Sequence, residues 1–211
     1  MKLHNYFRSS ASYRVRIGLA VKGLSYEYVP VHLLKDGGQQ NAASYKAELN
    51  PMGQVPVLEV DASTRLTQSV AILEYLEETH PEPALLPRDP AARARVRAAV
   101  ETINSGIQPL HNLGVMAEIR RLGGDDKAFA KGAIEKGLVA LEALHASFGG
   151  AFLVGDTLTL ADVFLVPQMF AARRFGADVA LTPRLRALDE KLTALPPFQA
   201  AHPERQPDYE A

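Results

Sequence analysis

Three serines lie close together near the start of the chain, where a short apolar run gives way to an amphipathic pattern. Ser9, Ser10 and Ser12 follow Arg8 in the segment "RSSAS". One hydroxyl, from Ser10 or Ser12, is enough to cap the helix that the next residues predict. The other hydroxyls can donate a hydrogen bond to a thiolate, and such a bond lowers the pKa of a thiol.

The chain has no thiol of its own to place there, because it contains no cysteine. Disulfides, thiolate metal sites and a cysteine nucleophile are therefore excluded, and any sulfur chemistry must use a thiol from outside. The six histidines show no metal-ligand spacing. No Walker A sequence and no dinucleotide-binding glycine motif is present. Lowering the pKa of a thiol beside the serines would make physical sense only if the thiol is supplied from outside the chain.

A proline and a strand-to-helix junction mark two further places where a ligand could bind. Pro56 opens a predicted strand, and the Val55–Pro56 bond can be trans or cis. A cis bond would turn the Val55 backbone outward, where its N–H and C=O could pair with an extended peptide. Gln68 and Ser69 close a strand and open a helix, so Ser69 can serve as N-cap while the helix start attracts a carboxylate.

Two segments in the second half of the chain carry polar residues among apolar ones. Thr159 and Asp162 in "LTLADVF" have the spacing of a capping box, which favours a folding role for Asp162 over a catalytic one. Gln108, His111 and Asn112 lie in "GIQPLHNLG", where a helix is expected to kink. Their shared face is either a solvated helix surface or a face directed at the first domain.

The apolar patterns divide the chain into an α/β part, 1–80, a proline-rich linker, 81–90, and an all-helical part, 91–211. The first part predicts the order β-α-β-(α)-β-β-α, with a hairpin before the last helix. In the last part we expect a long helix through 96–110, bent at Gly106 and Pro109. Three more helices are expected, near 134–144, 159–175 and 183–195.

Composition and charge narrow the classes of function. The 211 residues are 22% charged and carry a net charge of −1, so no basic surface for nucleic acid or anionic membranes is expected. No apolar run is long enough for a signal peptide or a transmembrane helix. The expectation is a soluble, cytoplasmic protein.

Together these segments resemble the glutathione transferase superfamily, across essentially the whole chain. "RSSASYRVR" is similar to the "SSCSWRVR" motif of the zeta class, and "KDGGQQ", "LNPMGQVP", "QSVAILEYLEE" and "GIQPLHNL" also resemble that class. The resemblance implies a thioredoxin-like α/β N-terminal domain, an all-α C-terminal domain that binds substrate, a homodimer, and glutathione as cofactor.

The resemblance also implies which residues hold glutathione. Ser9 and Ser10 would face its sulfur, the Val55 backbone would bind the tripeptide beside a cis bond at Pro56, and Gln68 and Ser69 would hold the γ-glutamyl carboxylate. The other implied cofactor-binding residues are Ala11, Ser12, Tyr13, Arg14, Gln40, Gln108, Asn112, Leu113 and Gly114. The family often has cysteine at the position of Ala11, and we expect its loss to change side reactions and not isomerisation.

The implied activity is a cis–trans isomerisation of maleylacetoacetate to fumarylacetoacetate, in the homogentisate route of tyrosine and phenylalanine breakdown. Glutathione thiolate would add to the alkene, allow rotation and leave again. Because the substrate is a dicarboxylate, Arg8 and Arg174 are candidates for binding its carboxylates, and Arg8 also for catalysis beside the serines. Arg173 and Arg174 could equally be a surface pair whose side chains snorkel.

Three other activities stay open. Maleylpyruvate isomerases of gentisate breakdown tend to carry arginines just after the kink motif, and Leu113 and Gly114 stand there in this chain, which favours maleylacetoacetate. A detoxifying transferase, including one that dehalogenates α-haloacids, would use the same thiolate. A non-enzymatic binding module is disfavoured, because such a module need not keep "RSSAS" and "QS" intact.

Overall fold

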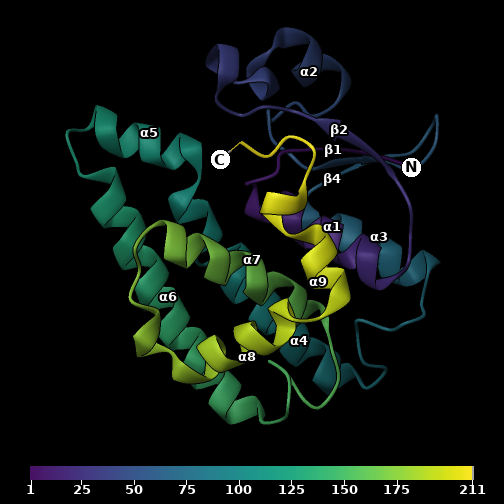
Figure 1. Cartoon of the computed structure of the whole chain (residues 1–211), viewed down its shortest axis with the longest axis vertical. Coiled ribbons are helices and arrows are strands. Elements are labelled where there is room, and N and C mark those ends of the chain that lie inside the picture. Colours follow the sequence, from purple (N-terminus) through teal and green to yellow (C-terminus); the bar gives the residue numbers. More distant parts are fainter. Residues whose placement is uncertain (211) are drawn as a thin grey trace. The chain divides into compact units, whose positions relative to one another are not determined.

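The computed structural model describes residues 1–210 of the chain (Figure 1). The chain divides into two compact units. The first unit comprises Met1–Pro83 and the segment from Leu195 onward, and the second comprises Ala84–Ala194. No helix in the described part of the chain is both long and apolar enough to cross a membrane.

The first unit is built on a four-stranded mixed sheet with the order β2-β1-β3-β4. β1 runs parallel to β2 and antiparallel to β3, and β3 pairs antiparallel with β4. The elements follow the predicted order, and the α/β thioredoxin-like prediction is confirmed. Their bounds are β1 (Lys2–Asn5), α1 (Ser10–Val21), β2 (Glu27–Pro30), α2 (Ala43–Glu48), β3 (Val57–Glu59), β4 (Arg65–Thr67) and α3 (Ser69–Thr79).

The elements of the first unit share an apolar core, and α1 is buried at every position from Ser12 to Leu19. Leu3 of β1 and Leu58 of β3 face each other in register and are fully buried. α3 buries Ile72, Leu73 and Leu76, which lie on one helical face. α1 packs closely on α3, since a Cβ at Gly18 would come within 2.2 Å of the Leu73 Cδ2 atom. The sheet and these helices therefore form a rigid base beneath the segments that connect them.

The end of the chain belongs to the first unit, whereas the sequence pattern placed it in the helical domain. α9 (Pro196–Ala201) packs on α1, and Figure 1 shows α9 in yellow beside α1. The physical reason is a buried contact that a pattern of apolar residues does not reveal. Arg16 is fully buried, and its Nε donates to the carbonyl oxygen of Ala201 over 3.1 Å. The division at 1–80, 81–90 and 91–211 must be corrected for this segment.

The second unit is all helical, as predicted, but the first long helix is broken and not bent. α4 ends at Asn104, and a 3-10 turn and a new helix follow. Pro109 has no N–H for a continuing helix, and the Cβ of any other residue at Gly106 would lie 2.6 Å from the Thr102 carbonyl oxygen. The elements are α4 (Pro90–Asn104), η3 (Gln108–His111), α5 (Leu113–Arg121), α6 (Asp126–Phe148), α7 (Leu160–Arg174), η4 (Val179–Leu181) and α8 (Pro183–Thr193).

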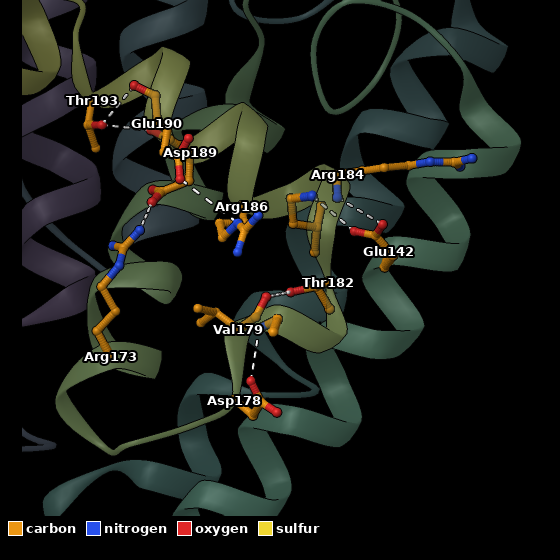
Figure 2. A network of polar contacts seen from close by, with 12 residues as sticks. Glu142, Arg173, Asp178, Val179, Thr182, Arg184, Arg186, Asp189, Glu190 and Thr193 are labelled. Atoms are coloured by element: carbon orange, nitrogen blue, oxygen red, sulfur yellow. Dashed lines mark hydrogen bonds and ion pairs between the residues drawn. The ribbon is translucent and has the colours of Figure 1, made fainter.

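A polar network fixes α8 within the second unit (Figure 2). The Glu142 carboxylate, on α6, accepts hydrogen bonds from the backbone N–H groups of Arg184 and Leu185 over 3.0 and 2.9 Å. These N–H groups lie in the first turn of α8, where helical partners are lacking. Arg173 at the end of α7 pairs with the buried carboxylate of Asp189 on α8. α8 is thus anchored to both neighbouring helices.

Candidate active site

The three serines lie where β1 passes into α1. Ser9 is the N-cap of α1, and its Oγ accepts a hydrogen bond from the Ser12 N–H over 3.2 Å. The prediction that Ser10 or Ser12 caps the helix is therefore wrong, since Ser10 is the first helical residue and Ser12 lies inside the first turn. A hydroxyl that accepts still has its own proton to donate. Ser9 can thus cap α1 and donate to an anion at the same time.

The other two hydroxyls are less exposed than their place at a helix start would suggest. Ser10 is 9% exposed and Ser12 is fully buried. Within residues 1–210 the Oγ of Ser12 has no hydrogen-bond partner. A buried polar atom without a partner is uncommon and calls for a ligand or an ordered water. Ala11 between them is half-buried, and Tyr13 is buried.

Arg16 holds the segment before Ser9 through hydrogen bonds from its guanidinium. Its guanidinium donates to the Asn5 side chain over 3.0 Å and to the carbonyl oxygens of Tyr6 and Phe7 over 3.3 and 2.8 Å. Burial lowers the pKa of Arg16 from its ordinary value. Arg8 is half-buried, and its guanidinium lies 5.9 Å from the ring centroids of both Tyr6 and Phe7. Both contacts limit where the Arg8 charge can point.

The turn before β3 contains the cis peptide bond Val55–Pro56, which confirms the conformation that the resemblance implies. Val55 lies outside the β ladder, which begins at Val57. The carbonyl oxygen of Gln54 accepts hydrogen bonds from the Tyr45 hydroxyl and the Asn50 Nδ2, each over 2.9 Å. These two side chains fix the backbone at Val55, and the sequence analysis missed them. The polar Asn50 between apolar residues in "LNPMGQVP" was the available signal.

The start of α3 has an unusual backbone. Gln68 is the N-cap, with φ +67 and ψ 120, and its side chain makes no capping hydrogen bond. The predicted cap, Ser69, is instead the first helical residue. A non-glycine residue with such angles is disfavoured by about 1–3 kcal/mol, and residues of this kind cluster at functional sites. The Gln68 Nε2 donates to the Met52 Sδ over 3.9 Å, a weak contact that a ligand carboxylate could replace.

Arg14 links the two helix starts. Both Arg14 and Ser69 are buried, and Nη1 of Arg14 donates to Oγ of Ser69 over 3.2 Å. The N-termini of α1 and α3 are thereby held in one place within the first unit. Helix N-termini carry partial positive charge and unpaired N–H groups, which suit a carboxylate or a thiolate. The arrangement can therefore bind an anionic thiol.

Gln40 lies in a short 3-10 turn, η2 (Gln39–Asn41), and is 7% exposed. Its Nε2 donates to the Leu33 carbonyl oxygen over 3.3 Å, while its Oε1 has no partner in the described part of the chain. Gly38 has φ +91, and a Cβ there would lie 2.5 Å from the Gln40 Nε2. The buried Oε1 is an acceptor that the fold itself leaves unused, as expected of a ligand contact.

The remaining predicted site residues belong to the second unit. Gln108 begins η3, and Asn112 caps α5 by accepting a hydrogen bond from the Leu113 N–H over 2.7 Å. Leu113 is 39% exposed, and a Cβ at Gly114 would meet nothing within 4 Å. These residues thus present a helix start with little steric cover within their own unit.

His111 and Arg174 both lie against the ring of Phe175. His111 is buried, its Nε2 lies 3.4 Å from the Gln168 Oε1, and its ring centroid is 5.3 Å from that of Phe175. The Arg174 guanidinium is 4.5 Å from the Phe175 centroid and is exposed. His111 therefore does not lie on an exposed polar face, and among residues 1–210 no group of three or more His, Asp or Glu side chains could hold a metal ion.

Asp162 is a folding element, and its capping box with Thr159 is confirmed. Its carboxylate accepts hydrogen bonds from the N–H groups of Leu153 and Thr159 over 2.9 and 2.8 Å, and from the Thr159 hydroxyl over 3.1 Å. Burial raises the pKa of Asp162 to about 6. Its oxygens are used in joining the start of α7 to the preceding loop.

Two matches to protein families cover most of the chain. Residues 3–84 match the glutathione S-transferase N-terminal domain, and residues 107–196 match the glutathione S-transferase C-terminal domain. The maleylacetoacetate isomerase of Mus musculus is 49% identical over 206 residues, which cover 98% of this chain and 94% of the mouse protein.

Solved structures agree in fold over the whole chain. Maleylacetoacetate isomerase of Anaeromyxobacter dehalogenans, crystallised with dicarboxyethyl glutathione and citrate in its active site, is 48% identical, with a TM-score of 0.88 and coverage of 100% of this chain and 97% of that one. A maleylpyruvate isomerase described as a bacterial zeta-class glutathione S-transferase is 42% identical, with a TM-score of 0.94 and full coverage of both chains. The chain therefore belongs to the glutathione S-transferase family, in its zeta class.

Proposed function

We propose that this protein is a glutathione-dependent isomerase that converts maleylacetoacetate to fumarylacetoacetate. The observation that carries the proposal is the Ser9 hydroxyl, which caps α1 and still has a proton to donate, in a chain without cysteine. The relatives named above support it, because the mouse and Anaeromyxobacter proteins are both maleylacetoacetate isomerases.

The residues present fit glutathione. The buried Gln40 Oε1 and Ser12 Oγ lack partners within residues 1–210, and an ammonium or N–H group of a tripeptide could satisfy an acceptor of this kind. In the proposal the Val55 backbone pairs with the extended peptide, and Gln68 and Ser69 hold its γ-glutamyl carboxylate at the start of α3. Further contacts are proposed for Ala11, Tyr13, Arg14, Gln108, Asn112, Leu113 and Gly114.

When bound, glutathione supplies a thiolate that adds reversibly to the alkene, so that the former double bond can turn. Ser9 and Ser10 donate hydrogen bonds that keep the sulfur ionised, and the N-terminus of α1 adds positive potential. Arg8 binds a substrate carboxylate and offsets the negative charge that develops beside the serines. Arg174 is the proposed second carboxylate contact. Ala11 leaves no protein thiol near the reacting centre for a substrate to alkylate.

The test measures how much glutathione remains after the reaction. Purified protein with a catalytic amount of glutathione should convert maleylacetoacetate completely, with no loss of the thiol. Stoichiometric consumption would instead identify a conjugating transferase, and absence of glutathione binding by calorimetry would leave a binding module. A homodimer, a cytoplasmic location and a place in tyrosine breakdown are part of the same proposal, and sedimentation and neighbouring genes test them.

A second candidate is maleylpyruvate isomerisation, which the 42% identical zeta-class structure favours. Maleylpyruvate and maleylacetoacetate carry the same reacting alkene and differ in the chain beyond it. Comparison of kcat/KM for the two substrates decides between them, since the ratio measures differential transition-state binding. We expect the larger value for maleylacetoacetate.

A further inference from the structure

The last described residues fold back onto the loop that carries the serines. Asp208 accepts a hydrogen bond through Oδ2 from the Phe7 backbone N–H over 3.0 Å. Its Oδ1 accepts from the Tyr28 hydroxyl. The Tyr209 ring packs edge-on against Phe7, with centroids 5.5 Å apart. Phe7 lies two residues before Ser9, so the end of the chain touches the segment that leads into the candidate active site.

The tail is held in this position by its own turn. Gln206 is buried, and its Nε2 donates to the carbonyl oxygens of Ala200 and His202 over 3.0 and 2.8 Å. The Tyr209 N–H donates to the Gln206 carbonyl oxygen over 3.0 Å. These bonds direct residues 207–210 away from α9 and toward Phe7. Asp208 is therefore placed by a defined turn and not by a loose end.

Both the N–H and the carbonyl oxygen of Phe7 are hydrogen-bonded to side chains. Phe7 lies beyond the end of β1, so its N–H is outside the sheet ladder and finds Asp208 instead. Its carbonyl oxygen accepts from Nη2 of Arg16 over 2.8 Å. Arg16 also binds the Ala201 carbonyl oxygen, so both holding groups depend on the C-terminal segment. Hydrogen bonds to charged partners are stronger than neutral ones and more directional than packing.

The nearby ion pair of Lys35 and Glu210 should contribute much less than Asp208 to positioning the Phe7 peptide. Glu210 pairs with Lys35 and approaches His32, but Glu210 and Lys35 are each more than half exposed. Exposed pairs of this kind stabilise little, because water and salt screen them. Asp208 is half-buried and satisfies a backbone N–H that has no place in the ladder. The positioning effect is therefore expected from Asp208 and not from Glu210.

We propose that Asp208 is a positioning residue for the reaction: by holding the Phe7 peptide it fixes the Tyr6–Arg8 loop, and through it the Ser9 hydroxyl and the Arg8 guanidinium. The proposal rests on the function proposed above, since it concerns the same site. Small displacements of groups that align reactants lower rates steeply. The C-terminal segment is thus part of the machinery that aligns the site.

The first experiment compares Asp208→Ala with Asp208→Asn and Tyr28→Phe. We expect Asp208→Ala to lower kcat about tenfold or more and to raise the pKa of the bound glutathione thiol, read from thiolate absorbance. Asp208→Asn keeps an oxygen acceptor for the Phe7 N–H and should recover part of the loss. Tyr28→Phe removes only the hydroxyl contact and should cost less than Asp208→Ala.

Two controls separate positioning from charge and from stability. Glu204→Gln makes the same charge change at an exposed residue of the same segment and should leave kcat unchanged. Ile17→Val removes one fully buried methylene from α1 and lowers stability, and it should not move the thiol pKa. The proposal is overturned if Asp208→Ala, compared with Ile17→Val at similar melting temperature, keeps the wild-type kcat and thiol pKa.

Amide exchange separates this proposal from the function itself. The Phe7 N–H should exchange faster in Asp208→Ala than in the wild type, and calorimetry should show weaker glutathione binding, whatever the protein isomerises. If the wild type fails to isomerise either substrate, the proposed function fails while faster Phe7 exchange and weaker binding still support the positioning role. Unchanged exchange at Phe7 contradicts that role even in an active enzyme.

Discussion

The Arg14 guanidinium donates a hydrogen bond through Nη1 to the Ser69 Oγ over 3.2 Å, and this contact joins the start of α1 to the start of α3. Both side chains are at most 4% exposed. One helix start carries the proposed thiolate donors and the other the proposed γ-glutamyl contact. In the proposed binding mode the two helix starts hold opposite ends of the tripeptide, so changing the Arg14–Ser69 contact should affect stability and binding together.

We predict that Ser69→Ala lowers the free energy of unfolding by about 1–3 kcal/mol, because a buried guanidinium N–H loses its acceptor. Glutathione affinity should fall as well, since the proposed carboxylate contact is lost. Arg14→Lys replaces the guanidinium, which is the donor of the same hydrogen bond. Urea denaturation and calorimetry of both variants and of the double variant test this, and the two effects should be less than additive. Full additivity would contradict a direct coupling.

Gln68→Gly should separate stability from binding. Glycine tolerates φ +67, so we expect a gain of roughly 1 kcal/mol in unfolding free energy after the entropy cost of glycine. Glutathione binding should weaken, because the side chain proposed to hold the γ-glutamyl group is gone. Asp36→Gly is the matched control. Asp36 has φ 55 and ψ 36, in the left-handed helical region that aspartate tolerates, so its gain should be smaller and binding unchanged.

Tyr45 should make the free energy of unfolding fall as the pH becomes alkaline. Burial raises the pKa of Tyr45 to about 12 in the folded protein, against a usual value of about 10. Its contribution is thus fully present below pH 10 and is lost as the pH rises toward 12, by roughly 2–3 kcal/mol.

Tyr45→Phe loses the hydrogen bond to the Gln54 carbonyl oxygen and should cost about 1 kcal/mol at pH 8, while Asn50 still binds that oxygen. The order of stability should reverse near pH 11, where the wild type becomes the less stable protein. Denaturation curves of the two proteins at pH 8, 10 and 11 measure this. A constant difference between them across that range would contradict the pKa of Tyr45.

The sequence was sufficient for the element order of the first unit, because alternation, helical spacing and the turn residues near Pro56 all agree there. It was wrong about both caps. A cap is decided by the backbone angles of one residue, and Ser9 at φ −68 and ψ 119 and Gln68 at φ +67 take that place in the structure. Neighbouring serines have the same side chain, so the pattern alone could not choose among them.

Long-range polar contacts account for most of what sequence patterns missed. The placement of α9 depends on Arg16, which is 185 residues from its partner Ala201. The Val55 turn depends on Tyr45 and Asn50, whose roles appear only once the chain has folded. The resemblance implies which residues face the ligand, and that remains a prediction; periodicity carries no information about the side chains that hold them in place.

Asp162 should prove essential for folding and dispensable for chemistry. Asp162→Ala removes the acceptor of the buried Leu153 and Thr159 N–H groups, so we expect a loss of about 3 kcal/mol or more in unfolding free energy. Glutathione affinity of the folded fraction should not change. The pKa of Asp162 is about 6, so a catalytic role would give the wild-type kcat profile an inflection near pH 6 that Asp162→Asn lacks. We expect no such difference.

The two adjacent arginines at the end of α7 should have different roles. Arg173 pairs with Asp189, whose side chain is 1% exposed and whose pKa burial raises. Arg173→Met should therefore lower unfolding free energy by about 2 kcal/mol at pH 7, since a buried carboxylate loses its partner. Because the raised pKa of Asp189 favours its neutral form, part of this loss should return as the pH is lowered.

Arg174→Met should instead leave stability within about 0.5 kcal/mol of the wild type, because its side chain is exposed. If Arg174 binds a substrate carboxylate, KM for the dianionic substrate should rise roughly tenfold, the cost of one lost charge-assisted hydrogen bond. Conjugation of glutathione to an uncharged electrophile is the internal control and should proceed at the wild-type rate. A rise in KM for Arg173→Met and none for Arg174→Met would assign the carboxylate contact to the other arginine, and the ion pair with Asp189 would then have to open during substrate binding.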